Sequence, residues 1–435
     1  MIATPLPSLA LFPWGDLIED FLDSIDLSFE QFCNEMSGGW MFGYVEALKR
    51  VGIRSVVFCI SNRVTAPERY LHKPTGATLC VLPAPKLHAI PRQWMHNPYG
   101  WTVEETFGQI DRVRRPAFHL LKDIAPYLAT PLRAVARELK RENCRVILCQ
   151  EYEYARFDAC VLLGQLLQIP VFATFQGGDF QLSRLERFFR PSTIQQCSGL
   201  IIATQTEIQR VQSRYQVPNN KVAQIFNPID LANWQVRDRN QSRERLGIPL
   251  TAQVVICHGR IDIHRKGLDI LLTAWQQICR ERSERELLLL LVGTGSDAER
   301  LHQLIAEQSI HNVLWVDEYV RDRDLMQQYL SAADLYTLAS RHEGFPVAPI
   351  EAMACGLPIV ATRAPGVAEI LGNEAMAGLI VPCEDTPALA AAIAQVLDDP
   401  TLRQQLSQQA RQRVEHCFSL EAIGEQLDRF LWLPN

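Results

Sequence analysis

The 435-residue sequence contains no long hydrophobic run, and we do not expect its first residues to act as a secretory leader. Its longest apolar stretches, such as Leu287–Val292, are far shorter than the ~20 residues that a helix needs to cross a bilayer. The short apolar patch Leu9–Trp14 has no basic segment before it, as a signal sequence would have. We therefore expect a soluble, cytoplasmic protein, and a peripheral contact with the inner face of a membrane stays open.

The chain also lacks an excess of basic residues. It has 43 Lys and Arg against 49 Asp and Glu, which gives a formal net charge of −6. Because a nucleic-acid-binding domain is usually basic, we expect no nucleic acid partner. A hydrophobic content of 47% with 21% charged residues is typical of a folded globular protein.

Closely spaced metal or redox motifs are missing as well. The twelve cysteines are scattered and form no Cys-x-x-Cys pair, which speaks against a zinc or thioredoxin-like site. Asp322 and Asp324 form an Asp-x-Asp triplet, but it stands at a predicted helix start, where aspartate is favoured as a cap. We expect no metal and no cofactor. The cysteines within apolar runs are expected to be buried free thiols: Cys59, Cys80, Cys149, Cys160, Cys257 and Cys355.

Strand and helix patterns alternate along the whole chain. In the first half, strands fit Leu9–Phe12, Ser55–Ile60, Thr78–Leu82, Val146–Cys149, Val171–Thr174 and Leu200–Thr204. In the second half, they fit Val254–His258, Leu287–Val292, Val313–Val316, Leu335–Leu338, Pro358–Ala361 and Leu379–Val381. Helical patterns between them predict two α/β lobes, each built on a doubly wound parallel sheet.

The boundary between the lobes is predicted in the polar stretch that follows Asn227, which is punctuated by Asn, Pro and Gly. We therefore place one lobe at residues 1–228, a second at 229–417 and a final amphipathic helix at 418–435. An acidic segment at residues 16–36 interrupts the first lobe and is predicted to form a short amphipathic helix.

The most specific segment is Ser340–Glu351, which follows a buried strand pattern. Pro346 is predicted to open the next helix, because its missing N–H costs nothing there. Glu343 then lies in the loop and Glu351 in the helix, at the carboxyl edge of a parallel sheet, where ligands of α/β proteins usually bind. Backbone N–H groups between the two glutamates favour a phosphate.

The run from Ala332 to Thr362, with its two glutamates, resembles the Glu-x7-Glu signature of the retaining family-4 glycosyltransferases. The resemblance implies the GT-B fold, in which two Rossmann-like lobes face each other across a cleft and the final helix crosses back to the first lobe. It also implies retaining transfer of a hexose-type sugar from a nucleotide-sugar to a glycan, lipid or small-molecule acceptor. In this family, Glu343 would hold donor-sugar hydroxyls and Glu351 the ribose. Four residues between them would line the same site: Gly344, Phe345, Pro346 and Val347.

Two cations complete the donor site that the resemblance implies. Arg260 follows a strand end and Lys266 precedes a helix, so both are expected at the same sheet edge. Their charges would stabilise the diphosphate as the bond to the sugar breaks. Arg260, Lys266 and Glu343 are therefore the predicted catalytic residues, with no separate nucleophile. The glycines that would let the backbone approach the donor are Gly38, Gly39, Gly293 and Gly295.

The acceptor side departs from the pattern of many relatives, which have a histidine followed by glycine after the strand at Val171–Thr174. This chain has Gln176, which forms hydrogen bonds but cannot act as a base. Gln150 and Glu151, after the preceding strand, are the other predicted acceptor-side groups.

Two other functions stay open from the sequence. Gly293–Ala298 fits the G-x-G-x-x-A fingerprint of dinucleotide binding, which would suit an NAD-dependent oxidoreductase. Gln176 is also compatible with a GT-B protein that binds a sugar nucleotide without catalysis.

Overall fold

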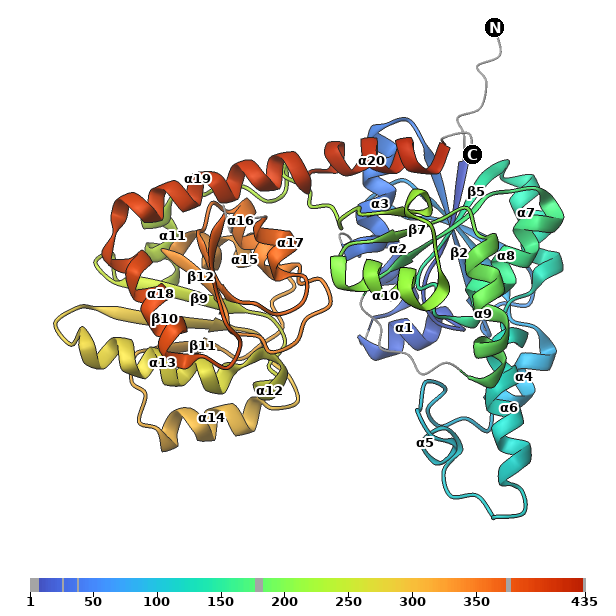
Figure 1. Cartoon of the computed structure of the whole chain (residues 1–435), viewed down its shortest axis with the longest axis horizontal. Helices are drawn as coiled ribbons and strands as arrows, with labels where there is room; N and C mark the ends of the chain where they lie inside the picture. The colour runs from blue at the N-terminus through green and yellow to red at the C-terminus, as the bar shows by residue number, and fades with distance from the viewer. Residues whose placement is uncertain (1–7, 26, 37–38, 177–182, 373–376, 433–435) are drawn as a thin grey trace, which may run out of the picture. The chain divides into compact units, whose positions relative to one another are not determined.

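The computed structural model describes residues 8–25, 27–36, 39–176, 183–372 and 377–432. The chain divides into two compact units (Figure 1). Unit 1 comprises residues 1–226 and 423–435, and unit 2 comprises residues 227–422. Most of the last helix therefore belongs to unit 1, although the whole of unit 2 separates it from the rest of that unit in sequence.

Unit 1 is built on an eight-stranded sheet in the order β3-β4-β2-β1-β5-β6-β7-β8. Neighbouring strands run parallel except for the antiparallel pair β3–β4. The central strand β1 is buried along its length, because helices cover both faces of a doubly wound sheet. The strands are β1 (Ser8–Phe12), β2 (Arg54–Ser61), β3 (Glu68–Leu71), β4 (Thr78–Pro83), β5 (Cys144–Cys149), β6 (Val171–Phe175), β7 (Gly199–Ile202) and β8 (Val222–Ala223).

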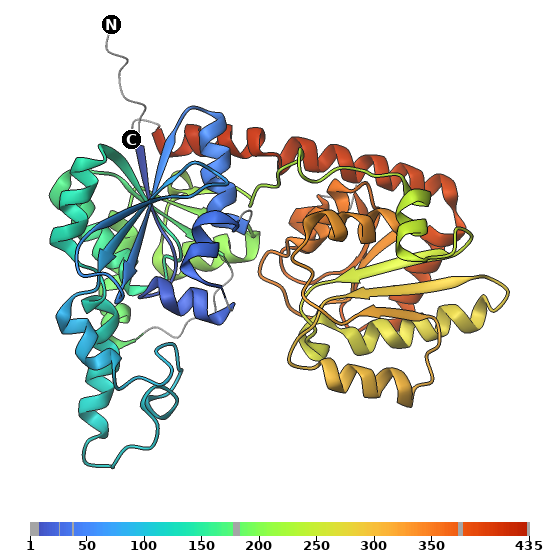
Figure 2. The ribbon, with the colours of Figure 1, turned by 180° about the vertical axis from the view of Figure 1, so that it is seen from behind.

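Helices lie on both faces of this sheet (Figure 2). The helices of unit 1 are α1 (Ile18–Ser24), α2 (Phe29–Asn34), α3 (Gly39–Arg50), α4 (Lys86–Arg92), α5 (Val103–Phe107), α6 (Arg115–Leu128), α7 (Leu132–Arg141), α8 (Ala155–Leu167), α9 (Arg184–Gln196), α10 (Gln205–Tyr215), the 3-10 turn η1 (Asn219–Lys221) and α20 (Leu420–Trp432). The prediction of one helix within residues 16–36 is wrong, since α1 and α2 are separate. Ser28 starts the second helix by accepting a hydrogen bond from the backbone N–H of Gln31 at 3.1 Å.

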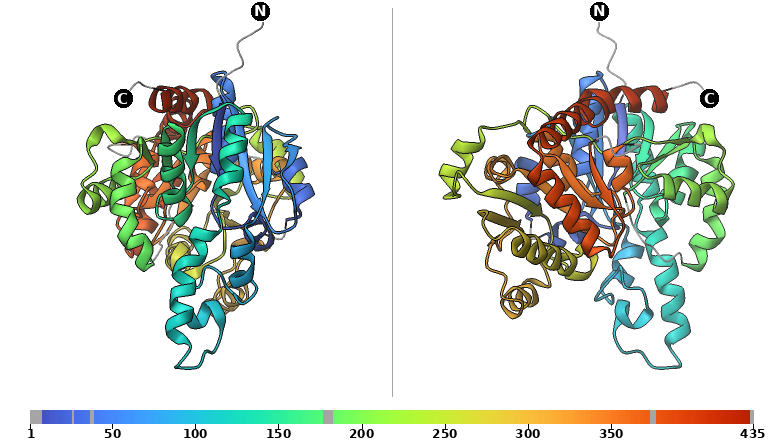
Figure 3. Two further views of the ribbon diagram at one scale, coloured as in Figure 1. Left: turned by 90° about the vertical axis from the view of Figure 1, so that its right-hand side faces the viewer. Right: turned by 60° about the vertical axis from the view of Figure 1, so that its left-hand side comes forward.

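The segment from α4 to α6 projects from unit 1 beyond the sheet (Figure 3). It has a small apolar core of its own, formed by Met95, Val103, Phe107 and Ala125. Phe107 packs edge-on against Phe118 of α6, with ring centroids 4.9 Å apart. The connection between β4 and β5 is therefore an ordered projection rather than a simple crossover helix.

Unit 2 is built on a six-stranded, wholly parallel sheet in the order β11-β10-β9-β12-β13-β14. Its strands are β9 (Gln253–His258), β10 (Leu287–Val292), β11 (Val313–Val316), β12 (Leu335–Leu338), β13 (Ile359–Thr362) and β14 (Gly378–Val381). Its helices are α11 (Arg239–Leu246), α12 (Ile263–Lys266), α13 (Leu268–Glu281), α14 (Ala298–Glu307), α15 (Arg323–Ala332), α16 (Ala348–Ala354), α17 (Val367–Leu371), α18 (Thr386–Asp398) and α19 (Pro400–Cys417). The order confirms the predicted doubly wound sheet in this half.

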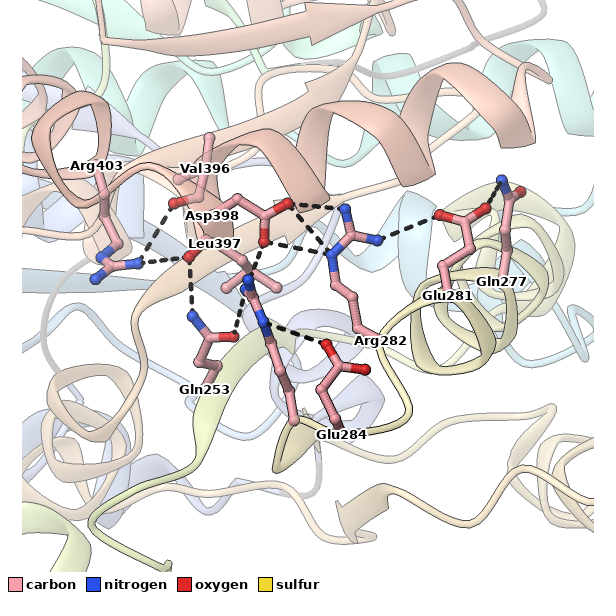
Figure 4. A network of polar contacts seen from close by, with 10 residues as sticks. Gln253, Gln277, Glu281, Arg282, Glu284, Val396, Leu397, Asp398 and Arg403 are labelled. Carbon is pink, nitrogen blue, oxygen red and sulfur yellow. Dashed lines mark hydrogen bonds and ion pairs between the residues drawn. The ribbon is translucent and has the colours of Figure 1, made fainter.

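A polar network joins the end of α13 to the end of α18 (Figure 4). Asp398 accepts hydrogen bonds from Arg282 at 2.8 Å and from Arg285 at 2.5 Å. Gln253, the first residue of β9, donates to the carbonyl of Leu397 at 2.8 Å. These contacts lie at the amino end of β9. They therefore stabilise the edge of the sheet that is opposite to the loops at its carboxyl end.

Other structural predictions are confirmed. The six cysteines expected to be buried free thiols are buried and unpaired. Asp322 caps α15, where its carboxylate accepts from the backbone N–H of Asp324 at 2.8 Å. Asp334, just before β12, accepts from the fully buried Arg243 at 2.8 Å and from the N–H of Val254 at 2.8 Å. The aspartate before the glutamate motif therefore fixes β12 to its surroundings.

Candidate functional site

The carboxyl edge of the unit 2 sheet brings together the predicted donor residues of this unit. β9 and β12 are neighbours in the sheet, so the loops that follow them meet. The backbone N–H of Arg341, after β12, donates to the carbonyl of Arg265, after β9, at 2.9 Å. Arg341 also spans this junction with its side chain, which donates to both oxygens of Asp269, at 2.7 and 2.8 Å.

Glu343 and Lys266 form the centre of this edge. The Lys266 Nζ donates to Glu343 Oε1 at 2.6 Å, and the Ser340 hydroxyl donates to the same oxygen at 2.6 Å. Glu343 is 6% exposed, so its charge is held by these two donors with little water around it. Gly267 has a φ of +61°, and a Cβ there would lie 2.0 Å from the carbonyl oxygen of Ala339. Only glycine permits this approach, which brings the preceding lysine to the glutamate.

Glu351 lies on α16 and contacts the end of β9. Its Oε2 accepts a hydrogen bond from Nε2 of His258 at 2.9 Å, and its side chain is 24% exposed. The Nδ1 atom of His258 is buried without a hydrogen-bond partner among the described residues. Tyr336 of β12 lies edge-on to the His258 ring, with centroids 5.4 Å apart. This packing fixes the imidazole and leaves the other oxygen of Glu351 available to a ligand.

The segment between the two glutamates differs from the prediction in one respect. α16 begins at Ala348, with Val347 as its N-cap, so Pro346 does not open the helix. Pro349 occupies the first turn instead, where its missing N–H also costs nothing. Pro346 is buried, Gly344 and Phe345 are half-buried, and Val347 is exposed. Pro346 therefore packs inside the loop, while the residues on either side of it are more accessible.

Gly293 and Gly295 lie in the loop after β10, beside the loop after β9. Gly293 has a φ of +135°, and a Cβ there would lie 2.0 Å from the carbonyl oxygen of Gly259. A Cβ on Gly295 would lie 2.1 Å from the carbonyl oxygen of Ile261. Packing of the two loops therefore requires both glycines. It also fixes the segment that carries Arg260, which is exposed and has no partner for its guanidinium among the described residues.

The same loop bears on the dinucleotide alternative. Asp297, at the N-cap of α14, accepts the backbone N–H of Ile263 through its Oδ2 atom at 2.9 Å. A carboxylate at this helix start repels a pyrophosphate, which a dinucleotide fold would need to bind there. The close packing of the two loops explains why glycine is needed at positions 293 and 295 without any bound ligand.

The acceptor-side residues lie at the carboxyl edge of the unit 1 sheet. Gln150 Oε1 accepts the backbone N–H of Trp14 at 2.7 Å. Glu151 Oε1 accepts the backbone N–H of Gln176 at 2.8 Å. Glu151 therefore links the ends of β5 and β6. Gly38 lies outside the described residues, and Gly39 begins α3.

Glu151 has unusual surroundings for a carboxyl group. It is 2% exposed, has a φ of +59° and leaves its Oε2 without a hydrogen-bond partner among the described residues. Burial raises the pKa of Glu151 to about 8, and the nearby Glu153 and Glu207 add to this rise. The N–H of Gln176 and the charge of Arg210 oppose it. Glu151 is thus neutral over most of the physiological pH range.

The described part of the chain lacks what a metal site or a membrane span requires. Within the described ranges, no group of three or more His, Cys, Asp and Glu side chains is placed to hold a metal ion. In the same residues, no helix combines the length and apolar character that crossing a bilayer demands.

Two family models match the chain, and each covers most of one unit. The model for Glycosyltransferase Family 4 matches residues 42–233, and that for Glycosyl transferases group 1 matches residues 238–413. The chain belongs to the family-4 glycosyltransferases of group 1. This confirms the family predicted from the glutamate motif and places the chain among transferase enzymes.

Curated relatives of this family member carry several different names. A D-inositol 3-phosphate glycosyltransferase of Saccharomonospora viridis is 29% identical over 250 residues, or 56% of this chain and 57% of that protein. A GDP-mannose-dependent monoacylated alpha-(1-6)-phosphatidylinositol monomannoside mannosyltransferase of Corynebacterium glutamicum is 31% identical over 201 residues, 45% of this chain and 51% of that one. The matches thus span about half the length of these two relatives. The N-acetyl-alpha-D-glucosaminyl L-malate synthase of Bacillus anthracis is 27% identical, covering 69% of this chain and 77% of that one.

Solved structures show the fold of this glycosyltransferase. A sucrose-phosphate synthase from Thermosynechococcus elongatus has a TM-score of 0.64 at 21% identity, covering 97% of this chain and 98% of that one. The Anabaena protein HepE, solved in complex with UDP, has a TM-score of 0.67 at 16% identity, covering 98% and 99%. The predicted GT-B fold class, with its two Rossmann-like lobes, is confirmed.

Sequence reasoning missed two residues of the candidate site in unit 2. His258 was expected only as part of a strand end, yet it holds Glu351. Ser340 was expected only as the start of the motif, yet it holds Glu343 together with Lys266. A signal existed for the histidine, since it directly precedes Gly259 and Arg260 at a strand end. No spacing rule links His258 to a glutamate far along the chain.

Proposed function

We propose that the protein is a retaining glycosyltransferase that moves a hexose-type sugar from a nucleotide-sugar donor to a hydroxyl acceptor. One observation carries this proposal: at one sheet edge of unit 2, Glu343 is held by Lys266, Glu351 is held by His258, and Arg260 is exposed nearby. Two orienting carboxylates and two cations match a sugar nucleotide, which has two sets of hydroxyls and a diphosphate between them.

The cations act on the diphosphate in this proposal. The Arg260 guanidinium has no partner among the residues that the structure describes. The Lys266 ammonium has three donors and makes a single hydrogen bond, to Glu343. Both therefore have donors available to phosphate oxygens. Because negative charge grows on the diphosphate as the sugar leaves, their contribution is larger in the transition state than in the bound donor.

The carboxylates orient the donor rather than attack it. Glu343 already accepts two hydrogen bonds on Oε1, which leaves its other oxygen for a sugar hydroxyl. Glu351 likewise offers one oxygen to the ribose diol. A glycosidase instead needs one protonated acid and one unencumbered nucleophile. In the proposed mechanism, the acceptor attacks on the face that the diphosphate leaves, and the leaving phosphate oxygen takes the acceptor proton.

The comparisons support a nucleotide-sugar donor without fixing its base. HepE has been solved with UDP, whereas the name of the Corynebacterium glutamicum relative specifies GDP-mannose. The named acceptors of the relatives also differ. A thermal-shift screen against UDP-, GDP- and ADP-sugars, followed by transfer assays with the best binder, identifies the donor. A donor at a hundredfold excess over its Kd stabilises the protein by ~2.7 kcal/mol.

Three results would overturn the proposal. Stabilisation by NAD and by no sugar nucleotide would favour the oxidoreductase. Donor binding with neither transfer nor hydrolysis would favour the non-catalytic alternative. A product of inverted anomeric configuration, detected by NMR, would show that the transfer is not retaining.

We also propose that no metal assists the transfer, so EDTA should leave turnover nearly intact. Loss of turnover both with EDTA and in the Asp322→Asn variant would show that a bound metal, rather than Arg260 and Lys266, stabilises the charge on the diphosphate.

Lys266→Met tests the assignment of charge stabilisation. We expect kcat to fall by about 10²–10³, with a smaller change in donor affinity, because the charge matters most in the transition state. Arg265→Met is a matched control, since its exposed side chain belongs to the same short helix. Steady-state kinetics check the split between kcat and KM. A rise in KM alone would make Lys266 a ground-state binding residue.

A further inference from the structure

The switch point of the unit 1 sheet, where the strand order reverses, lies between the loops that follow β1 and β5. The chain places β2 on one side of β1 and β5 on the other. In an open α/β sheet, a ligand usually binds at this point, beyond the carboxyl ends of the strands. The side chain of Gln150, after β5, accepts the backbone N–H of Trp14, after β1, at 2.7 Å. Unit 1 by itself therefore brings the two loops together.

These two loops, Pro13–Leu17 and Gln150–Tyr154, present uncharged groups. All their residues are buried except Trp14 and Gln150, which are half-buried. The acids of the loops are among the buried residues, namely Asp16, Glu151 and Glu153. The amide nitrogen of Gln150 carries two N–H donors and has no hydrogen-bond partner among the residues that the structure describes. A ligand that reaches this point therefore meets an indole ring and an amide.

The indole ring of Trp14 has a fixed aromatic neighbour. Tyr99 stacks against it with ring centroids 4.6 Å apart, and the ring of Tyr154 lies 6.1 Å away. The Tyr99 hydroxyl accepts the backbone N–H of Asp16 at 2.9 Å and donates to Asp20 at 2.7 Å. Because these hydrogen bonds fix the tyrosine beside the indole, the aromatic surface is ordered before a ligand binds.

The arginines next to this surface are paired or buried. Neither loop contains Lys, Arg or His. Arg92 donates to Asp20 at 2.5 Å, and Arg210 donates to Glu207 at 2.6 and 2.7 Å. Arg156 is 5% exposed and donates to two backbone carbonyls of the loop after β1, at 2.9 and 2.6 Å. An anionic ligand would have to displace a carboxylate to gain one of these cations, which costs affinity.

Three other basic residues follow neighbouring strands of the sheet. Arg63 follows β2 and lies 3.6 Å from Asp23. Lys86 begins α4, after β4, which is two strands from β1 in the sheet. Arg184 begins α9, after β6. A charged ligand would depend on these residues, which gives a measurable alternative to a neutral one.

We propose that Trp14, Tyr99 and Gln150 form a subsite for a neutral carbohydrate acceptor. The aromatic surface packs against the apolar C–H face of a pyranose, and the Gln150 amide donates to its hydroxyl oxygens. This inference rests on the proposed function and narrows its acceptor from any hydroxyl compound to an uncharged saccharide. An available cation would be needed to offset the desolvation of a phosphate or carboxylate, and the two loops contain none.

Saturation-transfer NMR tests binding directly and needs no donor. The probes are methyl α-glucoside, methyl α-mannoside and maltose, compared with glucose 6-phosphate and mannose 6-phosphate. We expect the neutral probes to bind and the phosphorylated sugars to bind at least about tenfold more weakly. Once a donor is identified, the same order is expected for kcat/KM in transfer.

Two substitutions test the assigned residues. Gln150→Glu keeps an oxygen for the Trp14 N–H and removes the amide donors, so binding of the neutral probes should weaken by about tenfold. Gln93→Glu makes the same change at an exposed position at the end of α4 and should leave binding unchanged. Trp14→Leu should weaken binding similarly, whereas Trp14→Phe keeps an aromatic ring and should retain most of it. Equal melting temperatures would show that the variants are folded.

Preferential binding of the phosphorylated sugars, or binding of no probe at all, would overturn the inference. Unchanged binding in both Gln150→Glu and Trp14→Leu would overturn it as well, because the saccharide would then bind elsewhere. Failure of the proposed function is a separate result. In that case no sugar nucleotide would stabilise the protein in the thermal-shift screen, whereas binding of the neutral probes is measured without one.

Discussion

Single residues at the two sheet edges differ in what surrounds their carboxyl groups. In unit 2, Glu343 and Glu351 each have a basic partner, Lys266 at 2.6 Å and His258 at 2.9 Å. In unit 1, Glu151 is buried beside other acids and receives a backbone N–H on one oxygen. The first pair is suited to orient neutral hydroxyls, whereas Glu151 is suited to hold the backbone of Gln176 as a neutral acid.

Glu351→Ala should weaken binding of the free nucleoside diphosphate as well as of the sugar nucleotide. A diol held by a carboxylate contributes ~1.5–3 kcal/mol, which corresponds to a Kd rise of about tenfold to a hundredfold. Isothermal titration calorimetry with UDP or GDP measures this. Glu299→Ala, on the exposed face of α14, is the control. If a folded Glu351→Ala protein keeps its nucleotide affinity, the ribose assignment is wrong.

Glu151→Gln should change how stability depends on pH. The ordinary pKa of 4.5 rises to about 8 in the folded protein, which therefore keeps a proton that the unfolded chain releases. This contribution is complete below the unfolded pKa and is lost as the pH rises through the folded pKa. Glutamine resembles the protonated acid, so the variant should match the parent at low pH and melt several degrees higher at about pH 8. A difference in melting temperature between variant and parent that stays the same at every pH would contradict this prediction.

Secondary-structure elements depend on contacts at their ends as much as on their own patterns. The last turns of α13 and α18 meet through Asp398, and its hydrogen bond with Arg282 lowers the pKa of that carboxyl. Since the group is half-exposed, solvent screening limits what the pair contributes. The network still joins two helices on the same sheet edge, which neither amphipathic pattern specifies alone.

Asp398→Asn should lower the free energy of unfolding by ~0.5–1 kcal/mol, because two arginines lose their shared anion. The lowered folded pKa means that the parent has this stabilisation above the unfolded pKa and loses it as the pH falls through the folded pKa. Denaturant titrations at neutral and at acid pH measure the difference. Glu284→Gln removes an exposed acid that only borders Arg285, at 4.0 Å, and should have little effect. If both variants lost the same free energy of unfolding, the effect would come from the overall surface charge and not from the contacts of Asp398.

At the scale of the whole molecule, the C-terminal helix does not belong to the unit that precedes it in sequence. α19 packs in unit 2, and α20 from Ile423 onward packs in unit 1. A Cβ on Gly424 would lie 2.4 Å from the carbonyl oxygen of Ala47 in α3, and Phe430 stacks edge-on to Phe172 of β6 at 5.3 Å. The last helix therefore completes the core of a unit that the chain left at Phe226.

Leu427→Ala should destabilise unit 1 by ~2–5 kcal/mol, because this fully buried side chain would leave a cavity under α20. Leu406→Ala, a buried leucine of α19, should destabilise unit 2 instead. Hydrogen exchange read by peptide identifies which amides lose protection in each variant. Faster exchange of the unit 2 strands in Leu427→Ala would contradict the placement of α20.

The sequence by itself determined the strands and the glutamate motif, because both are local patterns. The predicted Val254–His258 and Leu287–Val292 correspond to β9 and β10, since a fully buried parallel strand must be continuously apolar. Glu343 and Glu351 stand at a strand-to-helix junction as their spacing predicted. The start of α16 was misplaced, because Pro346 and Pro349 both suit a first helical turn and only packing selects between them.

The tertiary structure decided the features that depend on residues far apart in the chain. His258 reaches Glu351 because β9 and β12 are neighbours in the sheet, a fact of strand order that no spacing contains. The raised pKa of Glu151 results from burial by several elements at once. The projection from α4 to α6 was not predicted, because its core is small and its exposed tryptophans look like core residues in sequence. Local patterns specify elements, whereas burial and partners are set only when the elements pack.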